Sequence, residues 1–438
     1  MTDSIRSALA EYRSLEGGQR FFAALGYPTE EPIPSRELED LPQRARESLV
    51  SLHQLAQIKT EGDLFRIFHA ELAHERARRS DIRRFLEAFY RHYPQGNNLF
   101  VFTLRGRFDE LTFVSPERLP GRRDKDKMRL WLRILQVQRE HPYRTDLEVL
   151  ESIRRESDDP SQIWEQHRRA FSIQRVSERF YQDYRTVFQH IRELLAHTHP
   201  DHDPIWARDY AHQLLNRIMF LYFIARKGWL LGPEGSTDRN FMRHFWEAYR
   251  EVLQEGRTRP NTFHSSWLRV LFFEAFNKRW QNRAEYYQTF PHWLIHAFSL
   301  APYLNGGLYR QRPGLDDLLE EPLPDEPFTL LFEKWLDGTY PGLFERYNFT
   351  IVESGRFDEE VAVDPEMLGM VYERLVNVTF GEQGEEDQRG QAGIFYTPRT
   401  EIDLMCRLSL VDWLSNQLGA KYKDLLYQWV FAFSEEEK

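Results

Sequence analysis

A Thr-Pro pair in the last tenth of the chain has the residue types and spacing of a ligand-binding helix start. It follows two aromatic residues in the stretch Phe395-Tyr396-Thr397-Pro398. Thr397 is a suitable N-cap, and Pro398 would take the first helical position, where its missing N–H costs nothing. A helix N-terminus presents free N–H groups and the positive end of the helix dipole, which suit a carboxylate or phosphate. The pattern is also common in ordinary helix caps, and the residues alone favour an ordinary cap over a ligand site.

The helix predicted after this turn has an apolar stripe at helical spacing, formed by Ile402, Met405 and Leu408. The lone cysteine of the chain, Cys406, lies in the same helix, and we expect it to be a small buried apolar residue. A single cysteine excludes an internal disulfide framework and fits a reducing compartment.

A second set of candidates comprises Lys59, Asp63 and Glu71, which belong to the residue types of a magnesium-dependent nuclease. Such a site needs an acid on one strand and Glu-x-Lys, or a close variant, on the next strand. Here Glu71 is followed by Leu72 and Ala73, and Lys59 precedes both acids. We therefore predict a nuclease-like domain without a working centre. Cleavage by a centre built on Asp63 and Glu71 is the weaker alternative.

Basic residues gather between residues 117 and 144, with nine cations against four acids. Phosphate binding needs only such a local basic face, so the net charge of −10 does not exclude DNA. The opposing interpretation is a solvated loop over residues 120–127. The candidate DNA-binding residues are Arg118, Arg122, Arg123, Lys125, Lys127 and Arg129.

The stretch from His197 to Asp203 is rich in residue types that bind metals. Pro200 and Pro204 force an irregular path between two predicted helices. Metal sites need several ligands fixed by regular structure, so we predict a polar interhelical loop and no metal site.

Composition places the chain among folded globular proteins. Its 438 residues suffice for two or three domains, and 41% are hydrophobic and 14% aromatic. The N-terminus lacks an apolar signal region, and no run approaches eighteen apolar residues. We therefore expect a cytoplasmic protein without a membrane partner.

The elements that must position the candidates alternate between strands and helices at first. Residues 1 to about 60 have a helical pattern, followed by a strand at 64–69, a helix at 81–93 and strands at 98–103 and 111–114, the last two joined by a turn around Gly106. This strand–helix–strand–strand order is the skeleton of restriction-type nuclease folds. Residues 117–156 predict a strand or helix and then a helix capped by Thr145.

Residues 157–300 are strongly helical in pattern. A helix at 209–231 has an apolar face of Leu214, Ile218, Leu221, Tyr222 and Ala225, and a second buried helix is predicted at 267–276. The turn at 303–308 contains two glycines and is expected to be structural.

The segment Gly393-Ile-Phe-Tyr-Thr-Pro-Arg-Thr-Glu-Ile-Asp-Leu-Met405 resembles the Tyr-Thr-Pro segment of gamma-class adenine-N6 DNA methyltransferases. Five upstream stretches are similar, in the same order, to type IIG and IIL restriction–modification enzymes and to the methyltransferases of BREX (PglX) and DISARM phage-defence systems. They are Phe220–Trp229, Pro302–Leu308, Arg346–Thr350, Glu360–Gly369 and Tyr372–Leu375. Together the similar stretches span roughly residues 205 to 412.

The resemblance implies an α+β, mainly α fold in four parts. These are a degenerate nuclease-like α/β domain (1–156), a helical domain (157–345), a helical connector with an acidic loop (346–392) and the start of a Rossmann-like methyltransferase domain (393–438). It also implies that Phe395, Tyr396, Thr397 and Pro398 line the edge of S-adenosylmethionine and that double-stranded DNA is a partner.

The catalytic motifs of such an enzyme do not occur in the sequence. We find neither the Gly-rich Asp-Pro-Ala-Cys-Gly-Ser-Gly type of cofactor loop nor the Asn-Pro-Pro-Tyr type of loop that holds a flipped adenine. We therefore assign no catalytic residue and expect this chain alone to be inactive. A catalytic region further along, or a separate catalytic chain, would be its partner. The rival hypothesis is a non-enzymatic DNA-binding or scaffold subunit that docks other proteins of a defence complex.

Overall fold

The computed structural model describes residues 2–74, 78–120, 128–281, 283–304, 307–319, 321–351, 358–365, 378–381, 384–387 and 399–431, with single positions 367, 369, 371 and 397. The fold is α+β and mainly α, as predicted. The chain divides into two compact units, Met1–Asp364 and Pro365–Lys438. The finer division into four parts stays a prediction.

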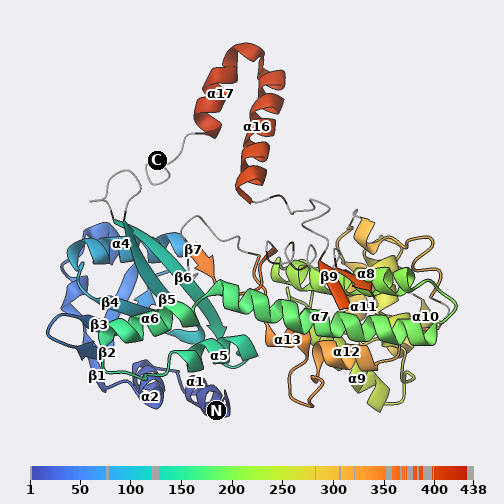
Figure 1. Ribbon diagram of the computed structural model, residues 1–438, viewed down its shortest axis with the longest axis horizontal. Coiled ribbons are helices and arrows are strands. Elements are labelled where there is room, and N and C mark those ends of the chain that lie inside the picture. Colours follow the sequence, from blue (N-terminus) through green and yellow to red (C-terminus); the bar gives the residue numbers. More distant parts are fainter. Residues whose placement is uncertain are drawn as a thin grey trace. The chain divides into compact units, whose positions relative to one another are not determined.

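A seven-stranded sheet forms the N-terminal part of the first unit (Figure 1). The strands lie in sequence order, and only the β3–β4 and β6–β7 pairs are parallel. The strand bounds are β1 Thr29–Pro34, β2 Leu49–Lys59, β3 Leu64–Leu72, β4 Asn97–Leu104, β5 Arg107–Pro120, β6 Met128–Gln138 and β7 Asp358–Glu360.

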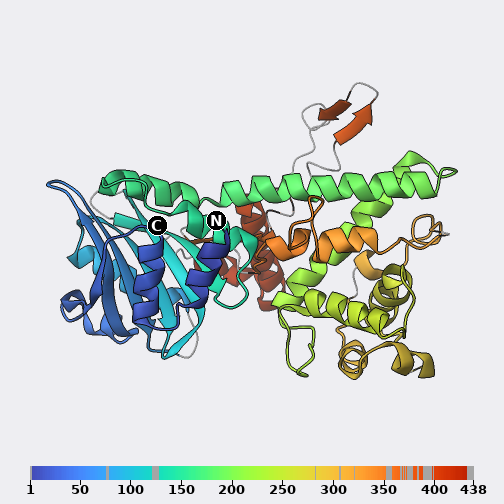
Figure 2. The same cartoon turned by 90° about the horizontal axis from the view of Figure 1, so that it is seen from below.

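Helices cover both faces of this sheet. On one face α4 (Arg79–His92) and α3 (Gln43–Arg46) pack over a core that includes Phe68, Phe85 and Phe100. On the other lie α1 (Thr2–Ala10), α2 (Leu15–Ala24), α5 (Arg144–Ser152) and α6 (Pro160–Ala170), with α1 and α2 in blue in Figure 2. Helix α4 is the crossover that makes β3 and β4 parallel.

The predicted strand–helix–strand–strand order is confirmed by β3, α4, β4 and β5, with Gly106 in the turn at positive φ. The helical pattern expected up to residue 60 is wrong beyond α2, because β1 and β2 are strands. The open choice for the basic segment resolves to a strand, β6. The N-cap of α5 is Tyr143 rather than Thr145, whose hydroxyl donates instead to the Arg346 carbonyl at 3.1 Å.

The rest of the first unit is helical and is organised around α8 (Pro204–Arg226), which is buried along most of its length. Its predicted apolar face is confirmed, and Gly228 follows it at positive φ, as a C-terminal stop requires. The predicted buried helix at 267–276 is present as two π-helical segments. The other helices are α7 Ile173–Thr198, α9 Phe241–Gln254, η2 Phe263–Leu268, η3 Leu271–Ala275, α10 Ala284–Thr289, α11 His292–Ser299, η4 Gly307–Tyr309, α12 Glu326–Phe332 and α13 Leu343–Arg346.

The second unit contains a two-stranded sheet and a helical hairpin. Strands β8 (Val378–Gly381) and β9 (Gly384–Asp387) are antiparallel. Helices α16 (Arg399–Leu418) and α17 (Lys423–Val430) pack against each other, joined by the short helix η5 (Ala420–Tyr422). Throughout the described ranges, every helix is too short or too polar to cross a bilayer.

Candidate functional site

The predicted cofactor segment is described only at Thr397, which is exposed. Phe395, Tyr396 and Pro398 lie outside the described residues. The helix predicted to follow them is confirmed, because α16 begins at Arg399. The geometry of the proposed cofactor edge therefore stays a prediction.

Helices α16 and α17 expose an unusually large amount of apolar surface. Cys406 is exposed, so the prediction that it is buried is wrong. The only large apolar side chains buried within the described part of the hairpin are Val411 and Leu426. The exposed large apolar residues are Ile402, Leu404, Met405, Leu408, Leu410, Trp413, Leu418, Tyr422, Leu425, Tyr427 and Trp429. Exposed large apolar side chains in such number are typical of a surface that contacts another part of a protein.

Two polar contacts hold the hairpin together without covering that surface. The Arg407 guanidinium donates to the Val430 carbonyl oxygen at 3.0 Å, and the Lys423 ammonium lies 3.7 Å from an Asp412 carboxylate oxygen. Surface ion pairs of this kind contribute little to stability. Further stabilisation of the hairpin would therefore come mainly from burial of its apolar side chains.

The basic segment forms the hairpin of β5 and β6, whose ladder runs from Glu110–Gln138 to Pro120–Met128. Arg118 is half-buried, donates to the Pro94 carbonyl and lies 5.7 Å from the centre of the Tyr90 ring. Arg129 is also half-buried on β6. Arg118 thus already contacts the protein, which makes it a weaker candidate for a phosphate contact.

Other cations of the same segment are used internally. Arg133 pairs with Glu117 at 2.6 Å, and Arg139 donates to the carbonyl oxygens of Phe108 and Ala10. The remaining predicted DNA-binding residues, Arg122, Arg123, Lys125 and Lys127, fall outside the described ranges. The proposed DNA contact of this hairpin therefore depends on its tip.

Of the nuclease candidates, Lys59 and Asp63 flank the turn between β2 and β3, whereas Glu71 lies far from both. Asp63 lies in the turn before β3, where its carboxylate accepts from the Leu64 N–H at 3.3 Å. Glu71 is at the opposite end of β3 and accepts from the Gly106 N–H at 2.5 Å. At about 3.3 Å per residue, eight residues of strand place the two acids roughly 26 Å apart. A magnesium centre shared by Asp63 and Glu71 is therefore excluded.

Between these acids, His69 is buried in the sheet. Its Nδ1 lies 3.0 Å from the Tyr12 hydroxyl and its Nε2 lies 3.0 Å from the Thr103 hydroxyl. Burial lowers the pKa of His69 to about 3, with a smaller contribution from His53. The imidazole is therefore neutral at neutral pH and serves as a core hydrogen-bonding group.

The His197–Asp203 stretch is the predicted link between two helices, α7 and α8. His199 and His202 pack on the Trp206 ring, with ring centres at 5.1 and 4.6 Å. The His199 Nε2 accepts from the Glu321 N–H at 3.4 Å. Within the described ranges, no group of three or more potential ligands is placed to hold a metal ion.

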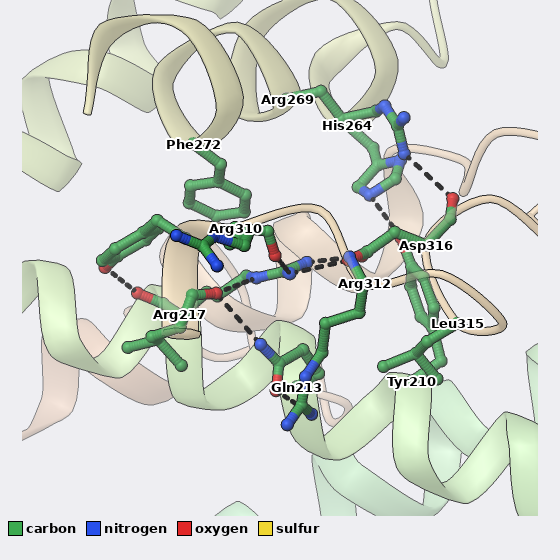
Figure 3. Close-up of polar contacts among 12 residues, drawn as sticks. Tyr210, Gln213, Arg217, His264, Arg269, Phe272, Arg310, Arg312, Leu315 and Asp316 are labelled. Atoms are coloured by element: carbon green, nitrogen blue, oxygen red, sulfur yellow. Dashed lines mark hydrogen bonds and ion pairs between the residues drawn. The ribbon is translucent and has the colours of Figure 1, made fainter. Parts of the chain in front are cut away.

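A buried polar site lies between α8 and the loop at residues 307–316, and Figure 3 shows its contacts. Arg217 on α8 binds both carboxylate oxygens of Asp316, at 2.6 and 2.8 Å. Its Nε also donates to the Leu308 carbonyl at 2.7 Å, and one Nη donates to the Arg310 carbonyl at 3.2 Å. This site was not predicted. The available signal was an arginine in the middle of a helix, directly before the apolar run Ile218–Ala225.

A second buried cluster joins the sheet to the helical region. The Arg226 guanidinium at the end of α8 donates to the Tyr143 hydroxyl and to the Asn348 side-chain oxygen. Asp146 on α5 is fully buried, and its Oδ2 accepts from the Tyr143 N–H at 2.9 Å. Burial raises the pKa of Asp146 to about 8, although Arg226 acts in the opposite direction. Asp146 is therefore largely protonated at neutral pH.

The Arg346–Thr350 stretch, singled out by its resemblance, supplies the other half of this joint. All five residues are buried. Phe349 packs on the Tyr222 and Phe180 rings, and the Thr350 hydroxyl donates to Glu360 at 2.9 Å. The described contacts of this stretch are those of a structural joint.

Similarity to known proteins gives the class to which the chain is related. No family model and no solved structure matches it. It is similar to restriction–modification proteins of the methyltransferase kind. One relative is named "Putative type II restriction enzyme and methyltransferase RM.MjaORFECS2P", from Methanocaldococcus jannaschii, and is 29% identical over 201 residues. The match covers 45% of this chain and 14% of that protein.

Proposed function

We propose that this chain is the N-terminal part of an S-adenosylmethionine-dependent adenine-N6 DNA methyltransferase of a restriction–modification or phage-defence system. The observation that carries the proposal is the similarity to a far longer restriction enzyme and methyltransferase, of which the matched segment spans 14%. The match, the Tyr-Thr-Pro segment and the upstream motifs agree on one class of protein. The enzyme would act in the cytoplasm on double-stranded DNA.

The exposed apolar surface of α16 and α17 supports the division of labour within this proposal. Because apolar residues such as Trp413 and Trp429 are stabilised by removal from water, the hairpin favours packing against a catalytic methyltransferase region. The catalytic region would supply the cofactor loop and the adenine pocket. Phe395, Tyr396, Thr397 and Pro398 would contribute one edge of the cofactor site.

In this arrangement the present chain helps to bind the cofactor and to position the DNA, and methyl transfer occurs in the catalytic region. Thr397 would cap α16 so that the free N–H groups of its first turn face a carboxylate of the cofactor. An aromatic side chain at Tyr396 would stack against the cofactor's adenine ring.

The test is S-adenosylmethionine binding by calorimetry, for this chain and for the chain joined to its catalytic region. Tyr396→Ala is the test variant and Tyr287→Ala, at an exposed tyrosine of α10 outside the proposed docking surface, is the matched control. We expect binding only when the catalytic region is present, weakened by the first substitution and unchanged by the second. Methyl transfer to adenine, read by mass spectrometry of the DNA, tests the reaction itself.

The alternative function is a DNA-binding or scaffold subunit without methyl transfer, with other defence proteins as partners. The exposed hairpin favours it as well, because a docking surface for a separate chain has the same character. Absence of cofactor binding in every assembly, together with retained docking through α16 and α17, would select this alternative.

A further inference from the structure

The loop at residues 307–316 presents two arginines on an exposed turn. Arg310, Gln311, Arg312, Pro313 and Gly314 are all exposed, whereas Tyr309 and Asp316 at its two ends are buried. Gly314 has positive φ, with open space where a side chain would be, so the turn projects into solvent. The loop therefore combines exposed cations with buried ends.

The ends of the loop are fixed by contacts to α8 and to Asn277, which follows η3. Tyr309 donates through its hydroxyl to the Arg217 carbonyl at 2.7 Å, and its own carbonyl accepts from the Asn277 side chain at 2.8 Å. The Leu315 carbonyl accepts from the Trp206 indole at 3.1 Å. These contacts hold the backbone in one conformation, so the arginine side chains start from fixed positions.

The buried Asp316 forms hydrogen bonds with the backbone of the turn. Its carboxylate accepts from the Arg312 N–H at 2.7 Å while it binds Arg217, and its own N–H donates to the Arg312 carbonyl at 3.0 Å. The negative charge of Asp316 is thus matched by the buried Arg217. It does not neutralise the exposed arginines.

Within the described part of the chain, Arg310 and Arg312 form no ion pair with a carboxylate. Figure 3 shows the Arg312 side chain extending to Gln213, whose neutral amide oxygen accepts from it at 3.1 Å. Arg269, on the same site, stacks its guanidinium 5.0 Å from the centre of the Phe273 ring and donates to the Asp316 carbonyl at 3.5 Å. Neutral partners thus orient Arg312 and Arg269 and leave their charges available. The loop is followed by an exposed acid, Asp317.

We propose that Arg310 and Arg312 form a contact site for the phosphate backbone of double-stranded DNA. The inference rests on the proposed function for the presence of DNA as a substrate, and it assigns a second contact surface that is separate from the 118–129 segment. Guanidinium groups bind phosphates bidentately, and a preorganised loop loses little conformational freedom on binding.

The chemistry of the loop favours phosphate over an acidic protein segment. Protein–protein interfaces centre on buried aromatic or large apolar residues, and the exposed part of this turn offers none. The exposed turn is also neither a helix nor a two-stranded ribbon, the elements that enter the major groove to contact base edges. The contact would therefore position the duplex without reading its sequence.

The test measures duplex DNA affinity of the 438-residue chain, by fluorescence anisotropy of a labelled mixed-sequence duplex over a range of salt concentrations. The variant R310Q/R312Q is compared with R36Q/R44Q, which removes the same charge from exposed positions on the sheet region. Loss of two phosphate contacts should weaken binding and reduce the magnitude of the slope of log binding constant against log salt concentration by about 1.8. The control should match the wild type. Equal urea midpoints for all three proteins confirm that folding is retained.

The proposal is overturned if the wild type does not bind duplex DNA, if the salt slope is unchanged in R310Q/R312Q, or if both variants change the slope equally. A loss that appears only with polyglutamate as the probe assigns the loop to an acidic protein segment and also overturns it. Methyl transfer is scored separately on the complete protein. If methylation fails while the R310Q/R312Q effect stands, the DNA contact belongs to a scaffold and the proposed enzyme fails alone.

Discussion

Arg217 donates hydrogen bonds to both carboxylate oxygens of Asp316, a residue 99 positions further along the chain. The side chains are 2% and 0% exposed. Removing charges from water is costly, and a buried pair compensates only when its geometry is good and its remaining donors are used. Here Arg217 uses them on the Leu308 and Arg310 carbonyls. The pair therefore determines the conformation of the loop.

Removing one partner of this pair should be strongly destabilising. Asp316→Ala leaves the Arg217 charge buried without a counter-ion, at a cost of about 3–5 kcal/mol in the free energy of unfolding. The double variant R217M/D316L removes both charges and should lose less than Asp316→Ala alone. Urea denaturation monitored by circular dichroism gives both values. A loss below about 1 kcal/mol for Asp316→Ala would show that the pair is not buried in solution.

The neutral His69 predicts a specific acid sensitivity. Its folded-state pKa is about 3, and that of an unfolded histidine is about 6.5, so between these values the unfolded chain binds the extra proton. Its contribution to stability is thus present above pH about 6.5 and is lost as the pH falls towards 3.

The test of this acid sensitivity compares His69→Gln with the wild type by urea denaturation at about pH 7.5 and about pH 4.5. The destabilisation caused by the substitution should be greater at the higher pH. Tyr12→Phe is the matched control, because it removes the hydroxyl at 3.0 Å and keeps the imidazole. Equal destabilisation by His69→Gln at both pH values would contradict the buried neutral state.

Asp146 predicts the opposite pH dependence. Its pKa is raised to about 8 by burial, against about 3.9 in an unfolded chain, so the folded protein binds the extra proton between these values. The contribution of Asp146 to stability therefore falls as the pH rises from about 4 to about 8.

The isosteric variant Asp146→Asn mimics the protonated acid and removes this dependence. The unfolding free energy of the wild type minus that of the variant should be smaller at pH about 8.5 than at pH about 5. Because the amide side chain of the variant keeps an oxygen that can accept from the Tyr143 N–H, the fold should be retained. A difference that does not change with pH would show that Asp146 is ionised in the folded protein.

Several elements were predictable because one physical signal dominates their sequence. Helix α8 was predicted at 209–231 from the spacing of its apolar residues and lies at Pro204–Arg226, so its presence and its buried residues followed from periodicity but its bounds did not. Strand β2 was missed because its pairing with β3 shifts register twice, between Leu49 and Ser51 and between Gln54 and Ala56. Such irregularities break the alternation of buried and exposed residues on which strand prediction depends.

The sites depend on contacts that no local pattern contains. Arg217 and Asp316 meet only after the chain between them has folded, and a lone buried cation does not specify which acid will pair with it. The misassignment of Cys406 has a different cause. A helical stripe predicts burial of one face, but the face can be reserved for a partner, and in α16 it is exposed.

That exposed face leads to a prediction about association. Trp413 and Trp429 are 60% and 68% exposed. If the catalytic region covers this surface, substitution of either tryptophan by a charged residue places a charge in an apolar contact, which costs free energy unless the charge is paired. In the isolated chain the same substitution removes only exposed apolar area, so the fold should be unaffected and self-association should fall.

The variant W413E/W429E should therefore reduce self-association of the isolated chain and destabilise the protein that contains the catalytic region. Analytical ultracentrifugation of the 438-residue chain should show less concentration-dependent association than the wild type. The protein that contains the catalytic region should show a lower melting temperature, or loss of binding when that region is a separate chain. Y287E, at an exposed residue on α10, is the control and should change neither measurement. If W413E/W429E leaves the complete protein as stable as the wild type, the hairpin is not the contact surface, because burying two unpaired carboxylates cannot be neutral.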